Sequence, residues 1–254
     1  MADQDVLIAL VVAGIVLLLF YLYLSAVQRA FRTIGFTPQE AGAIIFLTLF
    51  LGWVTIPVFP YNGWWVGISI GGALVPIIIC AHLLKSRRAD IAEVALGTLI
   101  VAYASYFVTR PEEGVGIVSD LPYAFIPAIA AGLFSLSVFW MDIAKAAPLA
   151  YTCGIFGTLI GADVFHLSEM LSFTAPSEVV ILSVGGANIF DMVYLTGIVA
   201  VAVDMVAFWI KTQQQKRGLG AVIAEFQTGG SISGPSRDMK PAPKLVPTRK
   251  GRLP

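Results

Sequence analysis

Two aspartates lie in stretches of the chain where an ionisable side chain is costly. Asp163 ends the apolar segment Gly157-Thr-Leu-Ile-Gly-Ala-Asp163, and Asp191 lies in a second one, Gly185-Gly-Ala-Asn-Ile-Phe-Asp191. Placing an aspartate at mid-span in a bilayer costs about 2.5–3.5 kcal/mol, so such a residue is by default a functional-site hypothesis. Two carboxyl groups that meet in an apolar setting either share a proton or hold a cation between them.

Polar neighbours accompany both aspartates. His166 follows Asp163 by three residues and Asn188 precedes Asp191 by three, so each is expected to share a helix face with its aspartate. With Glu169 nearby, the set would suit a hard cation, or with the histidine a transition metal. No spacing matches an established metal motif, so the metal stays open and no cofactor is predicted.

Gly185 and Gly186 complete the predicted binding set. They interrupt an apolar stretch, 179–210, that is too long for one helix across a bilayer. Glycine is the residue that tolerates a break in regular backbone. We therefore expect an extended or re-entrant segment before the pair and a helix from about Ala187.

The composition indicates which kind of scaffold carries these residues. Hydrophobic residues make up 57% of the chain and charged residues 13%, with a mean hydropathy of +0.84. Soluble domains carry about 25% charged residues. The composition therefore predicts an all-α polytopic membrane protein whose main partner is the lipid bilayer, and no nucleic-acid partner. The two cysteines, Cys80 and Cys153, fall in apolar spans and are expected to be packing residues.

Seven apolar segments are each about long enough to cross a bilayer as a helix. They are Val6–Val27, Gln39–Pro57, Trp64–Leu84, Ile91–Val108, Leu121–Met141, Pro148–Phe165 and Ala187–Ile210. We divide the chain into a first transmembrane helix (1–30), a six-helix membrane domain (31–210) and a basic cytoplasmic tail (211–254). The tail is rich in Lys, Arg, Gly, Ser and Pro, which predicts disorder.

The basic residues of the connecting segments predict the orientation. They follow the first, third, fifth and seventh spans, whereas the other side carries only Arg110. By the positive-inside rule the N-terminus is outside and the C-terminus is cytoplasmic. The expected location is the inner or plasma membrane of the cell.

A weak internal repeat organises the membrane domain. Three times, an outward span precedes a short β-prone segment and then an inward span. The three segments are Val66-Gly-Ile-Ser-Ile-Gly-Gly-Ala, Val115-Gly-Ile-Val-Ser-Asp-Leu-Pro and Val180-Ile-Leu-Ser-Val-Gly-Gly-Ala. We expect the three helix starts that follow them to gather on the outer side, buried in protein or lining a wet cavity.

The aspartate motifs, with Ile70-Gly-Gly-Ala-Leu-Val-Pro76 upstream, resemble an uncharacterised family of prokaryotic multi-pass membrane proteins, domain of unknown function 1614. The resemblance covers the chain from about Gly35 to Val203. Family members usually carry Gly-Thr in place of Asn188-Ile189 and Asn in place of His166. The resemblance implies the fold and the membrane location, and it implies no activity.

A fainter similarity is to presenilin-type intramembrane aspartyl proteases. These enzymes carry one aspartate on each of two adjacent spans, the second after glycines and before an apolar run, as Asp191 is placed here. In this chain the glycines are displaced, and no further span carries the Pro-Ala-Leu element of those enzymes. The similarity would imply a catalytic pair, Asp163 and Asp191.

Three functions therefore follow from the sequence as alternatives. The first is a non-enzymatic membrane protein whose outer-side acidic cavity binds a cation, a proton or a small solute for transport. There Asp163 and Asp191 would alternate between ionised and neutralised states. The second is an intramembrane aspartyl protease with one aspartate as base and the other as acid. The third is a scaffold subunit whose partners bind the tail and the loops.

Overall fold

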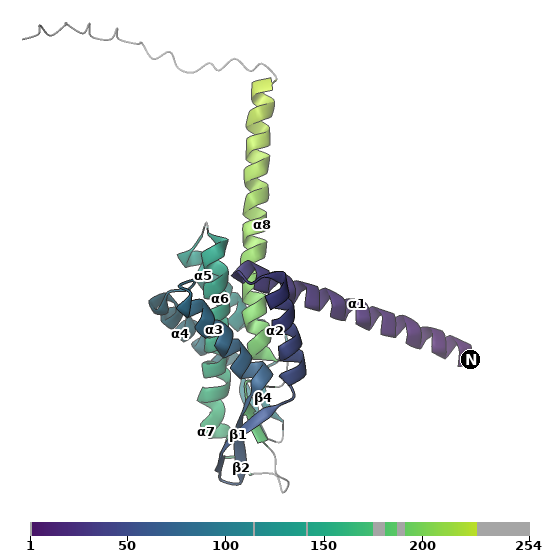
Figure 1. Cartoon of the computed structure of the whole chain (residues 1–254), viewed down its shortest axis with the longest axis vertical. Coiled ribbons are helices and arrows are strands. Elements are labelled where there is room, and N and C mark those ends of the chain that lie inside the picture. The colour runs from purple at the N-terminus through teal and green to yellow at the C-terminus, as the bar shows by residue number, and fades with distance from the viewer. Residues whose placement is uncertain (1, 114, 141, 175–180, 187–190, 228–254) are drawn as a thin grey trace, which may run out of the picture. The chain divides into compact units, whose positions relative to one another are not determined.

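The computed structural model of the chain describes residues 2–113, 115–140, 142–174, 181–186 and 191–227. Most of these residues are helical (Figure 1). The α-helices are α1 (Ala2–Ile34), α2 (Pro38–Leu51), α3 (Val75–Lys85), α4 (Ile91–Val108), α5 (Ile126–Val138), α6 (Ile143–Thr158), α7 (Phe165–Met170) and α8 (Met192–Gln227). Three shorter helical segments are η1 (Ile70–Leu74), η2 (Tyr123–Phe125) and η3 (Leu159–Val164); η1 and η3 are π-helical.

Three helices begin at side chains that cap their first backbone N–H groups. Thr37 and Glu40 form a reciprocal capping box at the start of α2. Asp90 accepts a hydrogen bond from the N–H of Ala92 (2.9 Å) at the start of α4. Asp142 accepts one from the N–H of Ala144 (3.1 Å) at the start of α6. Such caps satisfy donors that have no partner inside the helix. They fix where these three apolar helices start.

The strands form two small sheets. In the first, the order is β1 (Thr55–Tyr61), β2 (Trp64–Ser69), β5 (Ile181–Val184), with β1 antiparallel and β5 parallel to β2. In the second, β3 (Arg110–Glu112) pairs with β4 (Gly116–Val118) in an antiparallel hairpin. Each of the three β-prone segments of the sequence therefore contains a strand. The internal repeat itself stays a prediction.

The β1–β2 hairpin corrects two of the expected spans. The segment Gln39–Pro57 is helical only to Leu51, and Trp64–Leu84 begins as a strand before the helical segments η1 and α3. The hairpin turns at Asn62-Gly63, where both residues have positive φ angles of 49° and 85°. An Asn-Gly pair is the strongest short signal for such a turn. Hydropathy alone extended both expected spans into the strands of the hairpin, because the strand residues are also apolar.

Four helical segments are long and apolar enough to cross a membrane: Gln4–Ile34, Ile91–Val108, Ile143–Met170 and Met192–Arg217. Three shorter apolar helices are Pro38–Leu51, Ile70–Lys85 and Tyr123–Val138. Large apolar side chains cover the outside of several helices, among them Phe46, Phe50, Leu99 and Phe107. Soluble proteins rarely expose continuous apolar surface of this kind. The chain is a multi-pass membrane protein.

The first helix is longer than expected and ends inside the core. The expected boundary at residue 30 cuts through α1, whose Phe31 and Ile34 are fully buried in the main cluster beside Tyr151 and Tyr194. The first compact unit of the chain accordingly extends from residue 1 to residue 211. Cys80 and Cys153 are buried free cysteines within it.

The predicted disordered tail is also partly corrected. The helix α8 continues to Gln227, so residues 211–227 are helical. The reason is local, because Lys211-Thr-Gln-Gln-Gln-Lys-Arg217 consists mainly of residues with good helix propensity. Residues 228–254 lie outside the described residues.

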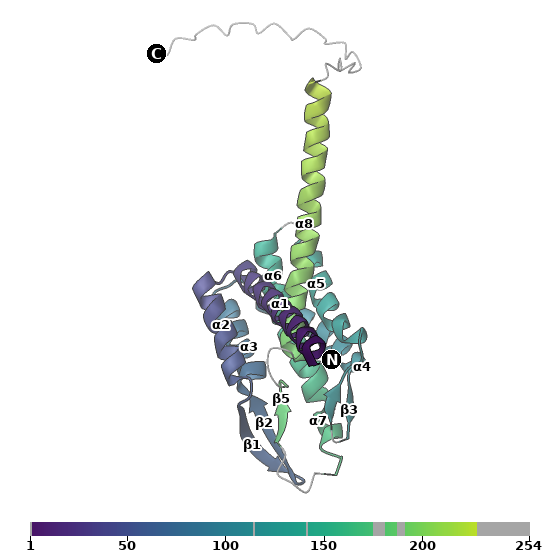
Figure 2. The same ribbon diagram turned by 90° about the vertical axis from the view of Figure 1, so that its right-hand side faces the viewer.

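Both small sheets lie at one end of the first compact unit, next to α7 (Figures 1 and 2). The segment η3 joins α6 to α7 at this end, and β5 contacts η3. Strands from distant parts of the sequence therefore meet the end of the span that carries Asp163. This end of the unit contains the candidate site.

Candidate functional site

Asp163 is positioned by a close crossing of two helices. It lies in η3, and Gly157 and Gly161 precede it at the place where α6 and η3 pass α4. A Cβ atom on Gly157 would collide with Val101, and one on Gly161 would collide with Ala102. Small residues allow helix backbones to approach in this way in membranes. The crossing holds the backbone of Asp163 at a fixed place at the end of the span.

The pair Gly185-Gly186 connects the two aspartates. Both glycines have positive φ angles, +88° and +57°, in the region that side chains disfavour. The N–H of Gly185 donates a hydrogen bond of 2.6 Å to Oδ2 of Asp163. A Cβ atom on Gly186 would collide with the carboxyl group of Asp191. The same two residues therefore bond one carboxyl group and pack against the other.

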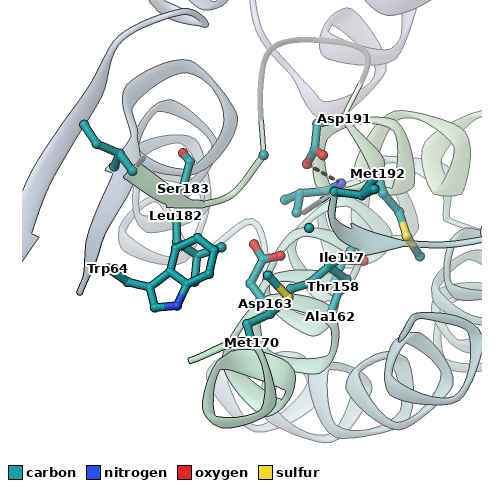
Figure 3. A pocket seen from close by; sticks show the side chains of 15 residues that line it. Trp64, Ile117, Thr158, Ala162, Asp163, Met170, Leu182, Ser183, Asp191 and Met192 are labelled. Atoms are coloured by element: carbon teal, nitrogen blue, oxygen red, sulfur yellow. Dashed lines mark hydrogen bonds between the residues drawn. The ribbon is translucent and has the colours of Figure 1, made fainter. Parts of the chain in front are cut away.

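Asp191 directly precedes α8. Its Oδ2 accepts a hydrogen bond of 3.0 Å from the N–H of Val193, drawn as a dashed line in Figure 3. A carboxylate at this position also interacts favourably with the positive end of the helix dipole. Part of its role is thus that of an ordinary helix cap. A carboxylate has about four acceptor positions, so bonds from the first turn of α8 leave capacity for a ligand.

Both carboxyl groups face one cavity of about 380 Å³ (Figure 3). Each aspartate is half-buried, and both belong to the wall of this cavity. Residues of the second and third β-prone segments contribute to the wall, for example Ile117 and Leu182, and so does Trp64 of β2, which lies just before the first segment. The expectation that the three helix starts gather on the outer side stays a prediction, and β4 belongs to a different sheet from β2 and β5.

The other residues of the predicted set lie in different places. Gly186 lines the cavity and Gly185 bonds Asp163, as described. His166 lies outside the cavity: its ring stacks on Tyr106 (4.7 Å between centroids), and its Nδ1 is 3.5 Å from Glu169. The π-helical turn of η3 holds more residues per turn than an α-helix, so a spacing of three no longer returns to one face. Asn188 lies outside the described residues.

Metal binding finds no support in the part of the chain described. Within it, no three His, Cys, Asp or Glu side chains come together as a metal would require. Arg110, the basic residue expected on the outer side, pairs with Asp120 across the end of the β3–β4 hairpin (2.5 Å). Both residues are exposed, and neither lines the cavity. The arginine guanidinium lowers the pKa of Asp120, first through its hydrogen bond and then through its charge.

Two residues were missed by the sequence reasoning. Trp64, expected only as the first residue of the third span, is 4% exposed and lines the cavity, and its Nε1 donates a hydrogen bond to the carbonyl oxygen of Phe173 (3.2 Å). The Asn-Gly turn before it could have revealed the strand on which it lies. Asp204, which the sequence reasoning left out of the candidate site, is fully buried in α8, and both its oxygens are 2.9 Å from Oγ of Ser135 on α5. Its position in the middle of an apolar span was the available signal.

Chemically, the cavity offers two acceptor groups of negative charge and a largely apolar wall. None of the described residues that line it is Lys, Arg or His, so no side chain there neutralises the pair. A group of opposite charge would relieve the repulsion between the two carboxylates.

Comparison with known proteins identifies the family and nothing further. The family model described as protein of unknown function (DUF1614) matches residues 37–203 of the chain. No curated protein and no solved structure matches. The matched region includes both aspartates, both glycines and Asn188, and it ends just before Asp204. Since the match covers well over half of the chain, the protein belongs to the DUF1614 family.

Proposed function

We propose that the cavity between Asp163, Asp191 and the Gly185-Gly186 segment binds a small cation, a proton or a small solute, and that it serves transport across the membrane. The single observation that carries this proposal is the presence of two carboxyl groups in one cavity whose described lining holds no basic residue. Charged groups in membrane domains are retained where they bind ions or move protons. In the proposed cycle each aspartate is neutralised when the cavity is loaded.

The orientation belongs to the same proposal. Seven spans with the N-terminus outside place the strand-bearing end of the first unit, and with it the cavity, on the outer side of the cell membrane. The support is the distribution of charge: Arg29, Arg32, Lys85, Arg87 and Arg88 all lie at or beyond the ends of α1 and α3 that this arrangement assigns to the cytoplasm. Basic residues near the ends of spans favour that side.

The experiment compares flux and binding in proteoliposomes for the full-length chain and its Asp163→Asn and Asp191→Asn variants. Asparagine keeps the size of the side chain and removes its charge. We expect each substitution to abolish pH- or cation-dependent flux while the protein still inserts and purifies. Glu113→Gln is the matched control, since Glu113 is an exposed carboxylate on the segment between β3 and β4 and does not line the cavity.

The two alternatives predict different results in the same experiment. An aspartyl protease would cleave a transmembrane peptide, and either substitution would stop that cleavage. A scaffold subunit would show neither flux nor cleavage, and both substitutions would be silent. If neither substitution changed flux or binding, the proposed function would therefore be overturned.

A further inference from the structure

The size of the cavity argues against a bare metal ion as its ligand. A volume of about 380 Å³ corresponds to about a dozen water molecules at ~30 Å³ each. Calcium takes six to eight oxygen ligands, and magnesium needs a regular octahedron of them. The described lining supplies two carboxyl groups, and most of the remaining side chains are apolar, including Ile117, Met170, Leu182 and Met192. A hard ion would depend on water for most of its ligands, because the described side chains offer it few oxygen atoms.

The charge of the cavity argues against an anion or a neutral solute. Asp163 and Asp191 both face it, and the described lining holds no basic side chain to balance them. An anion would add negative charge beside two acidic groups that no basic side chain offsets. A neutral solute would displace water from both carboxylates without replacing its stabilising effect, which is costly for a charged group.

Trp64 adds a feature that favours an organic cation. Its ring is buried at the wall of the cavity (Figure 3), as its 4% exposure shows. The hydrogen bond from Nε1 to the carbonyl oxygen of Phe173 fixes the orientation of the indole. Tryptophan is the aromatic side chain that attracts cations most strongly, by about 0.5–2 kcal/mol. Such attraction also operates on an ammonium group attached to an apolar body. The tryptophan and the two carboxylates lie on the wall of the same cavity.

We propose that the ligand is a small organic amine, with one or two ammonium groups on an apolar body. This inference rests on the proposed function, since it names the class of cation that the same cavity takes. An ammonium group donates up to three hydrogen bonds, which the two carboxylates accept. The apolar body contacts Ile117, Met170 and Leu182, and the indole of Trp64 covers a charged end.

The test measures binding to the full-length protein in lipid nanodiscs by titration calorimetry. The probes are 1,4-diaminobutane, magnesium chloride, calcium chloride and potassium chloride at matched ionic strength. We expect saturable binding of the diamine and no saturable binding of the three inorganic cations. Asp163→Asn and Asp191→Asn should each weaken diamine binding about tenfold or more, because each removes a charge-assisted hydrogen bond.

Trp64 supplies a second set of variants. Trp64→Leu should weaken diamine binding about fivefold, whereas Trp64→Phe retains an aromatic face and should lose less. Trp53→Leu is the matched control, because Trp53 is 79% exposed and does not line the cavity. Competition between the diamine and each inorganic cation on the unaltered protein needs no variant, so the test does not depend on every variant folding.

Two outcomes would overturn this inference, and they differ in what they imply. If an inorganic cation binds in an aspartate-dependent way and the diamine does not compete, the amine is wrong while the proposed function stands. If the diamine binds equally well to both aspartate variants, it binds elsewhere and the inference fails. If no probe binds and no flux depends on Asp163 or Asp191, the proposed function fails with it.

Discussion

Asp163 and Asp191 differ from Asp204 in their hydrogen-bond donors and in their access to a cavity, although all three are aspartates in apolar surroundings. The first two face a cavity, and they accept hydrogen bonds from backbone N–H groups, of Gly185 and Val193. Asp204 is fully buried between α8 and α5, and its bond comes from the hydroxyl of Ser135. The hydroxyl oxygen of Ser135 also lies 2.8 Å from the carbonyl oxygen of Gly132, to which it can donate its single proton. That arrangement suits a neutral carboxyl group, which can donate a hydrogen bond to Ser135.

The comparison shows two different uses of a carboxyl group in a membrane domain. A carboxylate that is held by backbone donors and open to a cavity can exchange a ligand. A carboxyl group that is closed off between two helices can only link them. The closed arrangement is tight, since a Cβ atom on Gly132 would meet Val203 at 2.8 Å and the carbonyl oxygen of Ala200 at 3.1 Å. We therefore expect the cavity pair to control binding and the buried aspartate to control stability.

The largest effect is expected from Gly185→Ala, which changes the backbone that donates a hydrogen bond to Asp163. The substitution forces a side chain into a φ of +88°, with its Cβ 2.8 Å from the backbone nitrogen of Ala73. We expect the free energy of unfolding to fall by about 3 kcal/mol and cation binding to be lost. Chemical unfolding in lipid micelles measures the first and calorimetry the second.

Gly42→Ala is the matched control for that substitution. Nothing lies within 4 Å of a Cβ atom there, and the position is inside α2, where alanine is favoured over glycine. Equal stability of the two variants would show that the close contact between the Gly185 region and η1 does not matter.

The next effect in size is that of Asp204→Ala. Removal of a fully buried side chain leaves a small void and breaks the link between α8 and Ser135, whose hydroxyl keeps the carbonyl oxygen of Gly132 as its acceptor, and we expect this to cost about 2 kcal/mol of unfolding free energy. Cation binding should be unchanged, in contrast to Asp163→Ala, which should lose binding at a stability cost below about 1 kcal/mol. Loss of binding in Asp204→Ala with intact stability would reverse the roles assigned to the two regions.

A smaller effect is expected from Ser135→Ala, which removes the partner of Asp204 and leaves the carboxyl group in place. We expect a cost of about 1 kcal/mol, since hydrogen bonds between membrane helices are individually modest. The double variant with Asp204→Ala should cost less than the sum of the single ones, because both remove the same interaction. Ser137→Ala on the exposed face of α5 serves as the control, and full additivity would argue against the bond.

The smallest effect concerns Asp120, an aspartate that is exposed to solvent. Arg110 lowers its pKa in the folded state, so its contribution to stability is present above the unfolded pKa of about 4 and is lost as the pH falls through the lower folded value. Because both side chains are exposed, we expect only a slight decrease in unfolding midpoint below about pH 4, abolished by salt and by Asp120→Asn. A large decrease that persists in Asp120→Asn would assign the acid sensitivity to another group.

Much of the fold could be predicted because hydropathy acts locally. The helix α4 has the bounds expected of the fourth span, Ile91–Val108, and membrane insertion needs little more than length and apolarity. The helix α6 begins at Ile143, before the expected start at Pro148. The β1–β2 hairpin was read as parts of two spans, since its residues are as apolar as those of a helix. The continuation of α8 to Gln227 was missed, because composition was given more weight than helix propensity there.

The aspartates and the glycine pair of the candidate site could be predicted from the sequence, whereas the side chains that form the walls of the cavity could not. Asp163 and Asp191 stand out because an acid in an apolar segment is costly, and Gly185-Gly186 because it breaks a long one. His166 was placed with them on the assumption of α-helical spacing, which the π-helical turn of η3 changes. Trp64 could not be assigned to the cavity, because its position depends on the pairing of β2 with β5 across a large separation in sequence.

By itself, the sequence determined that this chain is a multi-pass membrane protein with acidic residues in its apolar segments, since the cost of burying charge depends on residue type. Only the tertiary structure decided which of these acids face a cavity and which is closed between helices. That distinction depends on helix crossings at glycines and on the parallel pairing of two distant strands. Such contacts join residues far apart in the sequence, so no local pattern specifies them.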